Sequence, residues 1–137
     1  MTFSALIPGH LHERTQPTGE THGYVLAMRY LFAVIASQSA VVSASSTEMA
    51  AIDAFNDKIE AAGQRVMAAG VASPDAAIVF DNRDGRALVA HGPVIDADDF
   101  MAGFCVIEAE NDDVAHARAA EASPACNRRI EVRPFLR

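Results

Sequence analysis

Two segments of the chain are apolar at nearly every position rather than at every second one. From Arg29 to Ala36, hydrophobic side chains fill both alternating sets of positions, and the same is true from Gly103 to Ala109. Since successive residues of a strand point to opposite faces of a sheet, this pattern is typical of strands that are covered on both faces. We therefore expect these two segments to be the central strands of one sheet.

The polar segment after the first central strand contains the start of a helix. Ser45 and Glu48 have the spacing of a capping box, in which each side chain accepts a hydrogen bond from the other residue's backbone N–H. Apolar residues then recur at helical spacing, and Gly63 is placed to end the helix. The apolar stripe consists of Ile52, Phe55, Ile59 and Ala62.

A second helix is predicted after the second central strand. Asn111 is placed to cap it, and the two aspartates that follow complement the positive end of the helix dipole. The alanine-rich run extends through Ala122. Because a proline lacks the N–H that a helix needs, we expect this helix to stop at the Ser-Pro pair of Ser123 and Pro124.

Four shorter segments have strand patterns. Arg65 to Val71 contains a glycine and ends at a Ser-Pro-Asp turn, as an edge strand does. Ala77 to Asp81 and Arg86 to Ala90 flank the four-residue loop Asn82 to Gly85, whose glycine can take a positive φ, so they predict a protruding hairpin. Arg129 to Pro134 alternates apolar and charged residues and predicts a last strand.

The predicted order is strand, helix, strand, inserted hairpin, strand, helix, strand. This order predicts an α+β fold, namely a ferredoxin-like βαββαβ sheet with an inserted β-hairpin, because that sheet places its first and third strands in the middle. Two helices can cover only one face of such a sheet. A second copy of the chain is the simplest cover for the other apolar face, so we expect a homodimer.

The first 27 residues differ from the rest. Met1 to Ala27 contains prolines, glycines and no sustained periodicity, so we expect an N-terminal extension ahead of one domain over residues 28–137. Three histidines lie in this extension, His10, His12 and His22. Histidines on a flexible extension seldom form a dedicated metal site, so no metal is predicted there.

Composition excludes several classes of partner. Eighteen acidic and eleven basic residues give a net charge of −7, which disfavours nucleic acids and anionic lipid. No apolar run is long enough to span a bilayer, and the N-terminus lacks a signal-peptide pattern. Cys105 and Cys126 sit where small buried hydrophobes would serve, so we expect a protein of the reducing cytoplasm.

Five short motifs carry a resemblance to a known family. They are AAG (Ala61 to Gly63), NRDG (Asn82 to Gly85), LVAHGPV (Leu88 to Val94), AGF (Ala102 to Phe104) and EVRPF (Glu131 to Phe135). From residue 28 to residue 136 the chain resembles the YCII-related family, in the branch named for a DGPF motif. The resemblance implies a ferredoxin-like fold that dimerises into an α+β barrel. Most members have no known function, some use a His/Asp pair in ring chemistry or dehalogenation, and some genes lie beside alternative sigma factors.

The chain departs from the family at its name-giving motif. His91 stands where the family has Asp, and Val94 stands where it has Phe. Histidine is a side chain suited to act as a general base near neutral pH. The nearby aspartates of the loop, Asp96, Asp98 and Asp99, are placed to orient its ring. The alternative is a structural histidine that hydrogen-bonds a backbone carbonyl at the Gly-Pro turn.

The motif also predicts the ligand contacts. If a dimer encloses a pocket between two sheets, His91, Gly92, Pro93 and Asp96 are expected to line it, with His91 as the candidate catalytic residue. The three loop aspartates are interpreted as a solvated acidic loop rather than a cation site. Arg128, Arg129 and Arg133 suit either an anionic ligand or a charged strand edge.

Three functions remain open from the sequence. The first, which we favour, is a dimer that binds a small molecule without catalysis. The second is an acid/base isomerase or lyase acting on a small ring compound, with His91 as base, so whether the chain is an enzyme stays undecided. The third is a regulatory partner of a sigma factor. No glycine-rich phosphate loop is present, and no cofactor is predicted.

Overall fold

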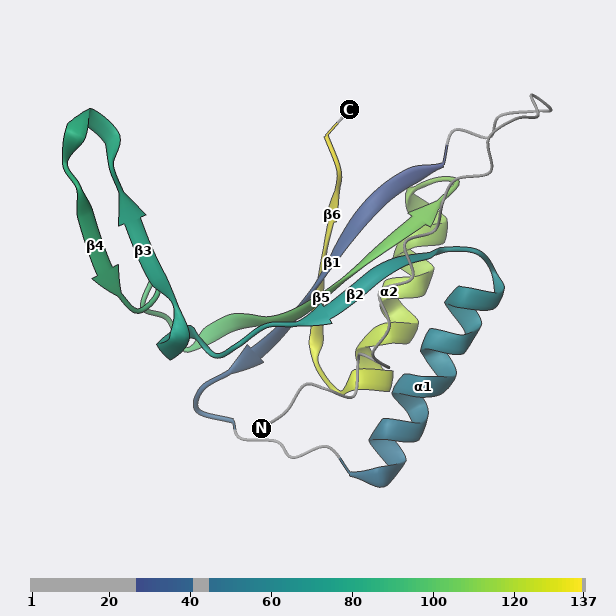
Figure 1. The fold of residues 1–137 in the computed structure, drawn as a ribbon. Coiled ribbons are helices and arrows are strands. Elements are labelled where there is room, and N and C mark those ends of the chain that lie inside the picture. The colour runs from purple at the N-terminus through teal and green to yellow at the C-terminus, as the bar shows by residue number, and fades with distance from the viewer. Residues whose placement is uncertain (1–26, 41–44, 137) are drawn as a thin grey trace.

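The computed structural model describes residues 27–40 and 45–136 of the chain (Figure 1). Its helices and strands follow in chain order: β1 (Met28–Ser37), α1 (Ser46–Ala61), β2 (Arg65–Gly70), β3 (Ile78–Asp81), β4 (Leu88–His91), β5 (Asp99–Ala109), α2 (Asp112–Cys126) and β6 (Arg129–Pro134). The predicted N-terminal extension lies outside the described residues, apart from Ala27. Within the described part, no helix is long and apolar enough to cross a membrane.

The strands form one four-stranded sheet and one separate two-stranded sheet. The large sheet has the order β2-β5-β1-β6, and every neighbouring pair in it is antiparallel. Within the described part of the chain, β3 and β4 pair only with each other. The predicted ferredoxin-like α+β fold with an inserted hairpin is therefore confirmed, and the two doubly apolar strands are the central ones.

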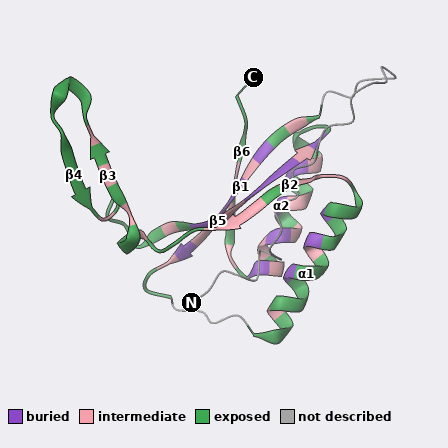
Figure 2. Ribbon diagram, in the orientation of Figure 1, coloured by how far each residue is buried: buried purple, intermediate pink, exposed green. Residues whose placement is uncertain are grey.

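The core lies between one face of the large sheet and the two helices (Figures 1 and 2). Its sheet side is built from alternate residues of the central strands, and its helix side from Ile59 of α1 and small residues of α2. The buried cluster comprises Tyr30, Phe32, Cys105, Ile107, Ala109, Ile59, Ala115 and Ala119. The α2 residues in the cluster are all alanines, so that helix can lie close to the sheet. Most of the large buried side chains therefore come from the strands.

The ends of α1 follow the sequence pattern. Glu48 N donates to Ser45 Oγ and Ser45 N donates to Glu48 Oε2, both at 3.2 Å, which is the predicted capping box. The helix ends at Ala61, and Gly63 has a φ of 70°. In that left-handed conformation a residue with a side chain is strained, which explains the glycine.

The end of α2 does not follow the prediction. The helix passes through Pro124 and ends at Cys126 instead of stopping after Ala122. The N–H that Pro124 lacks would have bonded the carbonyl of Ala120, which is an exposed residue. Asn127 then ends the helix with a φ of 52°. The single lost hydrogen bond therefore lies in the last turn, where its cost is small.

The strand β5 also begins four residues earlier than expected. It starts at Asp99, part of the predicted acidic loop, because Asp99 pairs with Ser37 at the end of β1. The register of this pair shifts between Val34 and Ile35, which leaves one residue of β5 unpaired as a bulge. The central strand is therefore longer than its apolar pattern indicated.

Gly103 lies beside this bulge and marks a close approach of two strands. A Cβ built on it would lie 2.9 Å from the backbone oxygen of Ala69 in β2, closer than such contacts occur. We expect Gly103→Ala to lower the unfolding free energy by about 1 to 3 kcal/mol, as overpacking does. Denaturant titration measures this. Gly85→Ala is a comparison with a different cost, because Gly85 has a φ of 69° and open space around it, so the loss there is backbone strain, whereas Gly103 has no positive φ and its loss comes from the close contact.

The inserted hairpin, called the arm (residues 78–91), is built as predicted but with a longer turn. β4 runs from Leu88 to His91 rather than from Arg86 to Ala90. The connection contains a single 3₁₀ turn, and Ala87 N donates to Asn82 Oδ1 at 3.2 Å. This turn delays the start of β4, while Gly85 takes the predicted positive φ.

Candidate functional site

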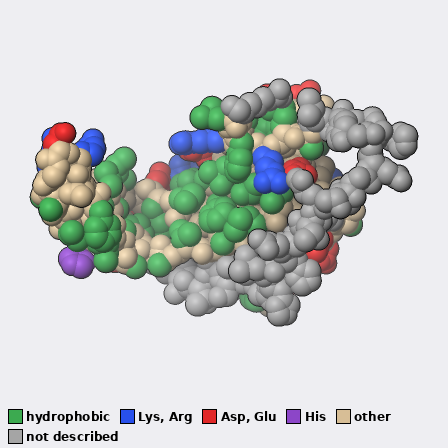
Figure 3. Space-filling view, turned by 45° about the horizontal axis from the view of Figure 1, so that its top comes forward, with side chains coloured by type: hydrophobic (Ala, Val, Ile, Leu, Met, Phe, Trp, Pro, Cys, Tyr) green, Lys and Arg blue, Asp and Glu red, His purple; other side chains and the backbone are tan. Residues whose placement is uncertain are grey.

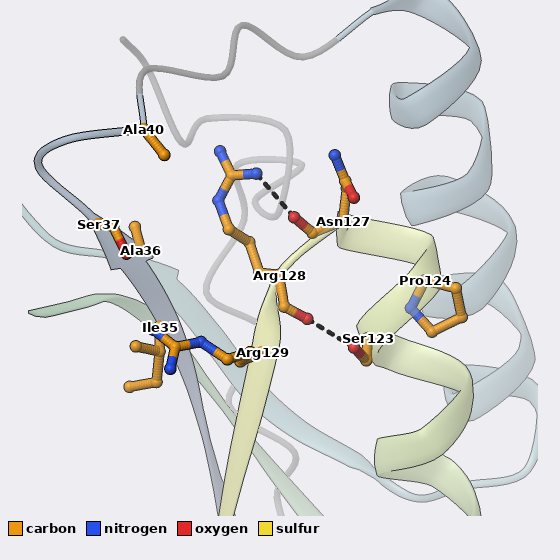
Figure 4. A pocket seen from close by; sticks show the side chains of 9 residues that line it. All are labelled: Ile35, Ala36, Ser37, Ala40, Ser123, Pro124, Asn127, Arg128 and Arg129. Atoms are coloured by element: carbon orange, nitrogen blue, oxygen red, sulfur yellow. Dashed lines mark hydrogen bonds between the residues drawn. The ribbon is translucent and has the colours of Figure 1, made fainter. Parts of the chain in front are cut away.

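Two hollows lie on either side of the end of β1. The larger has a volume of about 440 Å³ and is closed on one side by the end of α2 and the start of β6 (Figure 4). The smaller has about 280 Å³ and lies at the root of the arm, against Phe100 of β5 and Asp75. Ala36, Ser37 and Ala40 line both hollows, so the end of β1 is the wall between them.

A polar cluster of Ser37, Asp99 and Arg129 stands at this wall. Ser37 Oγ donates to Asp99 Oδ1 at 2.5 Å, and Arg129 Nη2 lies 2.8 Å from Asp99 Oδ2. The hydrogen bond from Ser37, followed by the contact with Arg129, lowers the pKa of Asp99 below its usual range, and the carboxylate in turn raises the pKa of Arg129. Strand pairing creates the cluster, because β1 lies between β5 and β6.

Arg128 adds a second guanidinium to the larger hollow. Its Nη1 donates to the carbonyl oxygen of Asn127 at 2.8 Å, and its own carbonyl oxygen accepts from Ser123 Oγ at 2.6 Å (Figure 4). These bonds fix the backbone between α2 and β6 and direct the Arg128 side chain past Asn127 toward Ala40. Two guanidinium groups therefore line this hollow, and the one of Arg129 pairs with the carboxylate of Asp99.

This arrangement suits a ligand with a negative group. Guanidinium N–H groups bind carboxylate and phosphate oxygens in pairs, and such charge-assisted hydrogen bonds are stronger than neutral ones. Asn127 lines the same hollow, and its amide nitrogen donates to Glu48 Oε1 at 3.4 Å. A hollow of this size falls within the range of small-molecule sites.

The acidic loop is held in place by its own carboxylates. Asp98 Oδ1 accepts the backbone N–H of Ser39 at 2.8 Å, and Asp98 Oδ2 accepts the Ser39 hydroxyl at 2.6 Å. Gln38 donates to the carbonyl of Ala97 at 3.0 Å. These bonds tie the loop to the segment after β1. Among the described residues, no group of three His, Cys, Asp or Glu side chains could hold a metal ion.

The motif residues lie elsewhere. His91 is exposed at the end of β4, where it pairs with Ile78, and the turn after it is fixed by a 2.7 Å hydrogen bond from Gly92 N to the Ala77 carbonyl. Gly92 has a φ of 101° and open space around it, so its backbone conformation rather than a close approach requires glycine. His91, Gly92, Pro93 and Asp96 line neither hollow. Their predicted contact with a ligand stays a prediction.

The two thiols are not suited to nucleophilic chemistry. Burial raises the pKa of Cys105 to about 11, and burial also raises the pKa of Cys126. A thiol attacks as its thiolate, which these environments disfavour. Both cysteines therefore serve as small core side chains, as their positions in the sequence indicated.

Comparison with known proteins identifies the family. The model of the YCII-related domain matches residues 28–137, which includes every helix and strand described above. A search of curated proteins finds no match to the chain. The fold and the family model agree, and the chain belongs to the YCII-related family.

Proposed function

We propose that this protein is a homodimer that binds a small molecule carrying an anionic group and performs no catalysis at that site. The observation that carries the proposal is the hollow of about 440 Å³ beside Arg128 and Arg129. Within the family, the sequence LVAHGPV supports a place in the branch named for the DGPF motif. The larger hollow is the proposed binding site.

The second sheet face supports the homodimer. Both helices pack against the face that carries Tyr30 and Phe32. On the opposite face, Leu31 and Phe104 are half-buried and Met101 is exposed, with ion pairs such as Arg29–Glu108 at its margin. An apolar sheet face without helices is stabilised when a second copy covers it, because the same patch is then buried twice.

Charge supports the nature of the ligand. The chain as a whole has a charge of −7, so an anion is repelled by most of its surface. At the hollow, two guanidinium groups gather, those of Arg128 and Arg129, and Arg129 pairs with the carboxylate of Asp99. Guanidinium N–H groups bind carboxylate and phosphate oxygens, so this hollow suits such a ligand.

The test is a thermal-shift screen with small mono- and dicarboxylates and inorganic phosphate. A ligand that binds the folded protein raises the melting temperature by mass action. Arg129→Gln should weaken binding of any hit by about tenfold or more, because a hydrogen bond to a charged group contributes about 1.5 to 3 kcal/mol. Asp99→Asn should strengthen it, since the competing carboxylate is removed.

Arg133→Gln is the matched control. Arg133 lies on the same strand as Arg129, is similarly exposed at 72% against 67%, and also pairs with a carboxylate, that of Glu131 at 2.6 Å. It lies outside the hollow. Equal loss of binding in both arginine variants would mean general charge attraction, and a screen without any hit would count against the proposed function.

A further inference from the structure

Among the residues that the structure describes, the arm has no neighbouring strand beyond its own two. β3 and β4 form a two-stranded sheet, and neither strand pairs with the large sheet. An isolated two-stranded hairpin is marginally stable in water and needs packing against another surface. The arm nevertheless forms a regular ladder of four residue pairs. Its side chains are therefore expected to pack against another surface.

One face of the arm is apolar and exposed. Paired residues of antiparallel strands share a face, and the pairs Phe80 with Val89 and Ile78 with His91 place these four side chains together. Phe80 is 73% exposed, and Val89 and Ile78 are exposed as well. Apolar side chains that are held in place but left in water bury no surface, so this face has the character of a contact surface.

The charges of the arm are balanced within it. Asp81 Oδ2 lies 2.9 Å from Arg83 Nη2 and 3.7 Å from Arg86 Nη1, and Arg86 also lies 3.9 Å from Asp84. The arm is therefore neutral in a chain of net charge −7. A second acidic copy is repelled by most of the molecule but not by this segment.

The arm also stands on the appropriate side. Figure 1 shows it at the end of the sheet, away from the helices, on the side of the uncovered face. In Figure 3, hydrophobic side chains gather in the middle of the molecule and again along the arm. Two further exposed apolar residues follow the arm in the chain, Val94 at 81% and Ile95 at 76%. A body that covers the sheet face therefore comes alongside the arm.

We infer that the arm is a clasp for a second copy of this chain, with the face of Ile78, Phe80, Val89 and His91 packed against that copy. In a two-fold pair each copy gives one arm and receives one, so the contact forms twice. The inference rests on the proposed homodimer and adds to it, because His91 becomes an interface residue instead of a solvent-exposed one.

The absence of tryptophan from the chain allows a direct test. Phe80→Trp introduces a single tryptophan on the apolar face of the arm. Leu88→Trp is the matched control, since Leu88 pairs with Asp81 and lies on the opposite face. Fluorescence emission is recorded over a dilution series, together with the mass from light scattering.

We expect the Phe80→Trp emission to be blue-shifted while the mass is that of a dimer and to move to the solvent-exposed position as the dimer dissociates. The Leu88→Trp emission should stay solvent-exposed throughout. If the mass is that of a dimer but the Phe80→Trp emission stays at the wavelength of a solvent-exposed tryptophan, the proposed clasp is overturned and the proposed homodimer is retained. A monomer mass at every concentration would overturn both.

Discussion

Replacing Phe32 with alanine is expected to lower the unfolding free energy by about 3 to 5 kcal/mol, the range for large-to-small changes at buried aromatic positions. Phe32 is only 1% exposed, in the middle of the central strand β1, and it packs between the sheet and both helices. Its loss leaves a cavity that the neighbouring strands cannot close, because their register is fixed by pairing on both sides. Urea titration followed by circular dichroism measures the change.

Phe135→Ala is the control for this prediction. Phe135 follows β6 and is 44% exposed, so the same chemical change removes less buried surface there and should cost well under half as much. Equal losses in the two variants would show that the core does not centre on β1. The comparison holds protein concentration constant, because the proposed dimer would add to the apparent stability.

The protein should lose stability in alkaline solution through Cys105. Burial raises the pKa of this thiol from 9.0 to about 11. The unfolded chain therefore releases the proton above pH 9 while the folded protein retains it, so folding is favoured below pH 9 and this advantage is lost as pH rises through 11. A difference of two pKa units corresponds to about 2 kcal/mol between pH 8 and pH 11.

The comparison with Cys105→Ala isolates this effect. Lysine and tyrosine side chains titrate in the same range, but they do so in both proteins. Between pH 8 and pH 11 the unfolding free energy of the variant should therefore fall by about 2 kcal/mol less than that of the wild type. Parallel pH profiles would show that water reaches the thiol and that its pKa is ordinary.

Features that depend on local chemistry could be predicted from the sequence. The capping box of Ser45 and Glu48 and the positive φ of Gly63 involve residues a few positions apart, and both are confirmed. The central strands could also be predicted, because a strand must be apolar on both alternations to be covered on both sides. The extent of β5 could not, since Asp99 joins it only through Ser37, 62 residues away in the chain.

The helix through Pro124 shows a different limit. The residue itself disfavours a helix, but its position in the last turn leaves only one hydrogen bond to lose. Whether that loss is tolerated depends on the exposure of Ala120 and on the left-handed end at Asn127, neither of which a local pattern contains. Position within the element decided the outcome here more than residue type.

The proposed binding site was the least accessible to sequence reasoning. The sequence marks Arg128 and Arg129 as candidates for an anionic ligand and Asp99 as part of an acidic loop, but it connects neither of them with Ser37. They meet because β1 has β5 on one side and β6 on the other, so the ends of three strands lie together at one edge of the sheet. Nothing in the separate segments signals that meeting.

The way the arm is inserted affects how the family can diversify. Gly70 and Gly103 are paired across β2 and β5, and Val71 N donates to the Ala102 carbonyl at 3.0 Å, so the chain leaves and re-enters the sheet at neighbouring points. A segment with adjacent ends can be shortened, exchanged or replaced by a tight turn at little entropic cost, without moving the register of the sheet. With the arm as the proposed contact to a second copy, a change confined to this segment would alter partner choice, so two copies of the gene that differ only there would form separate homodimers within one cell.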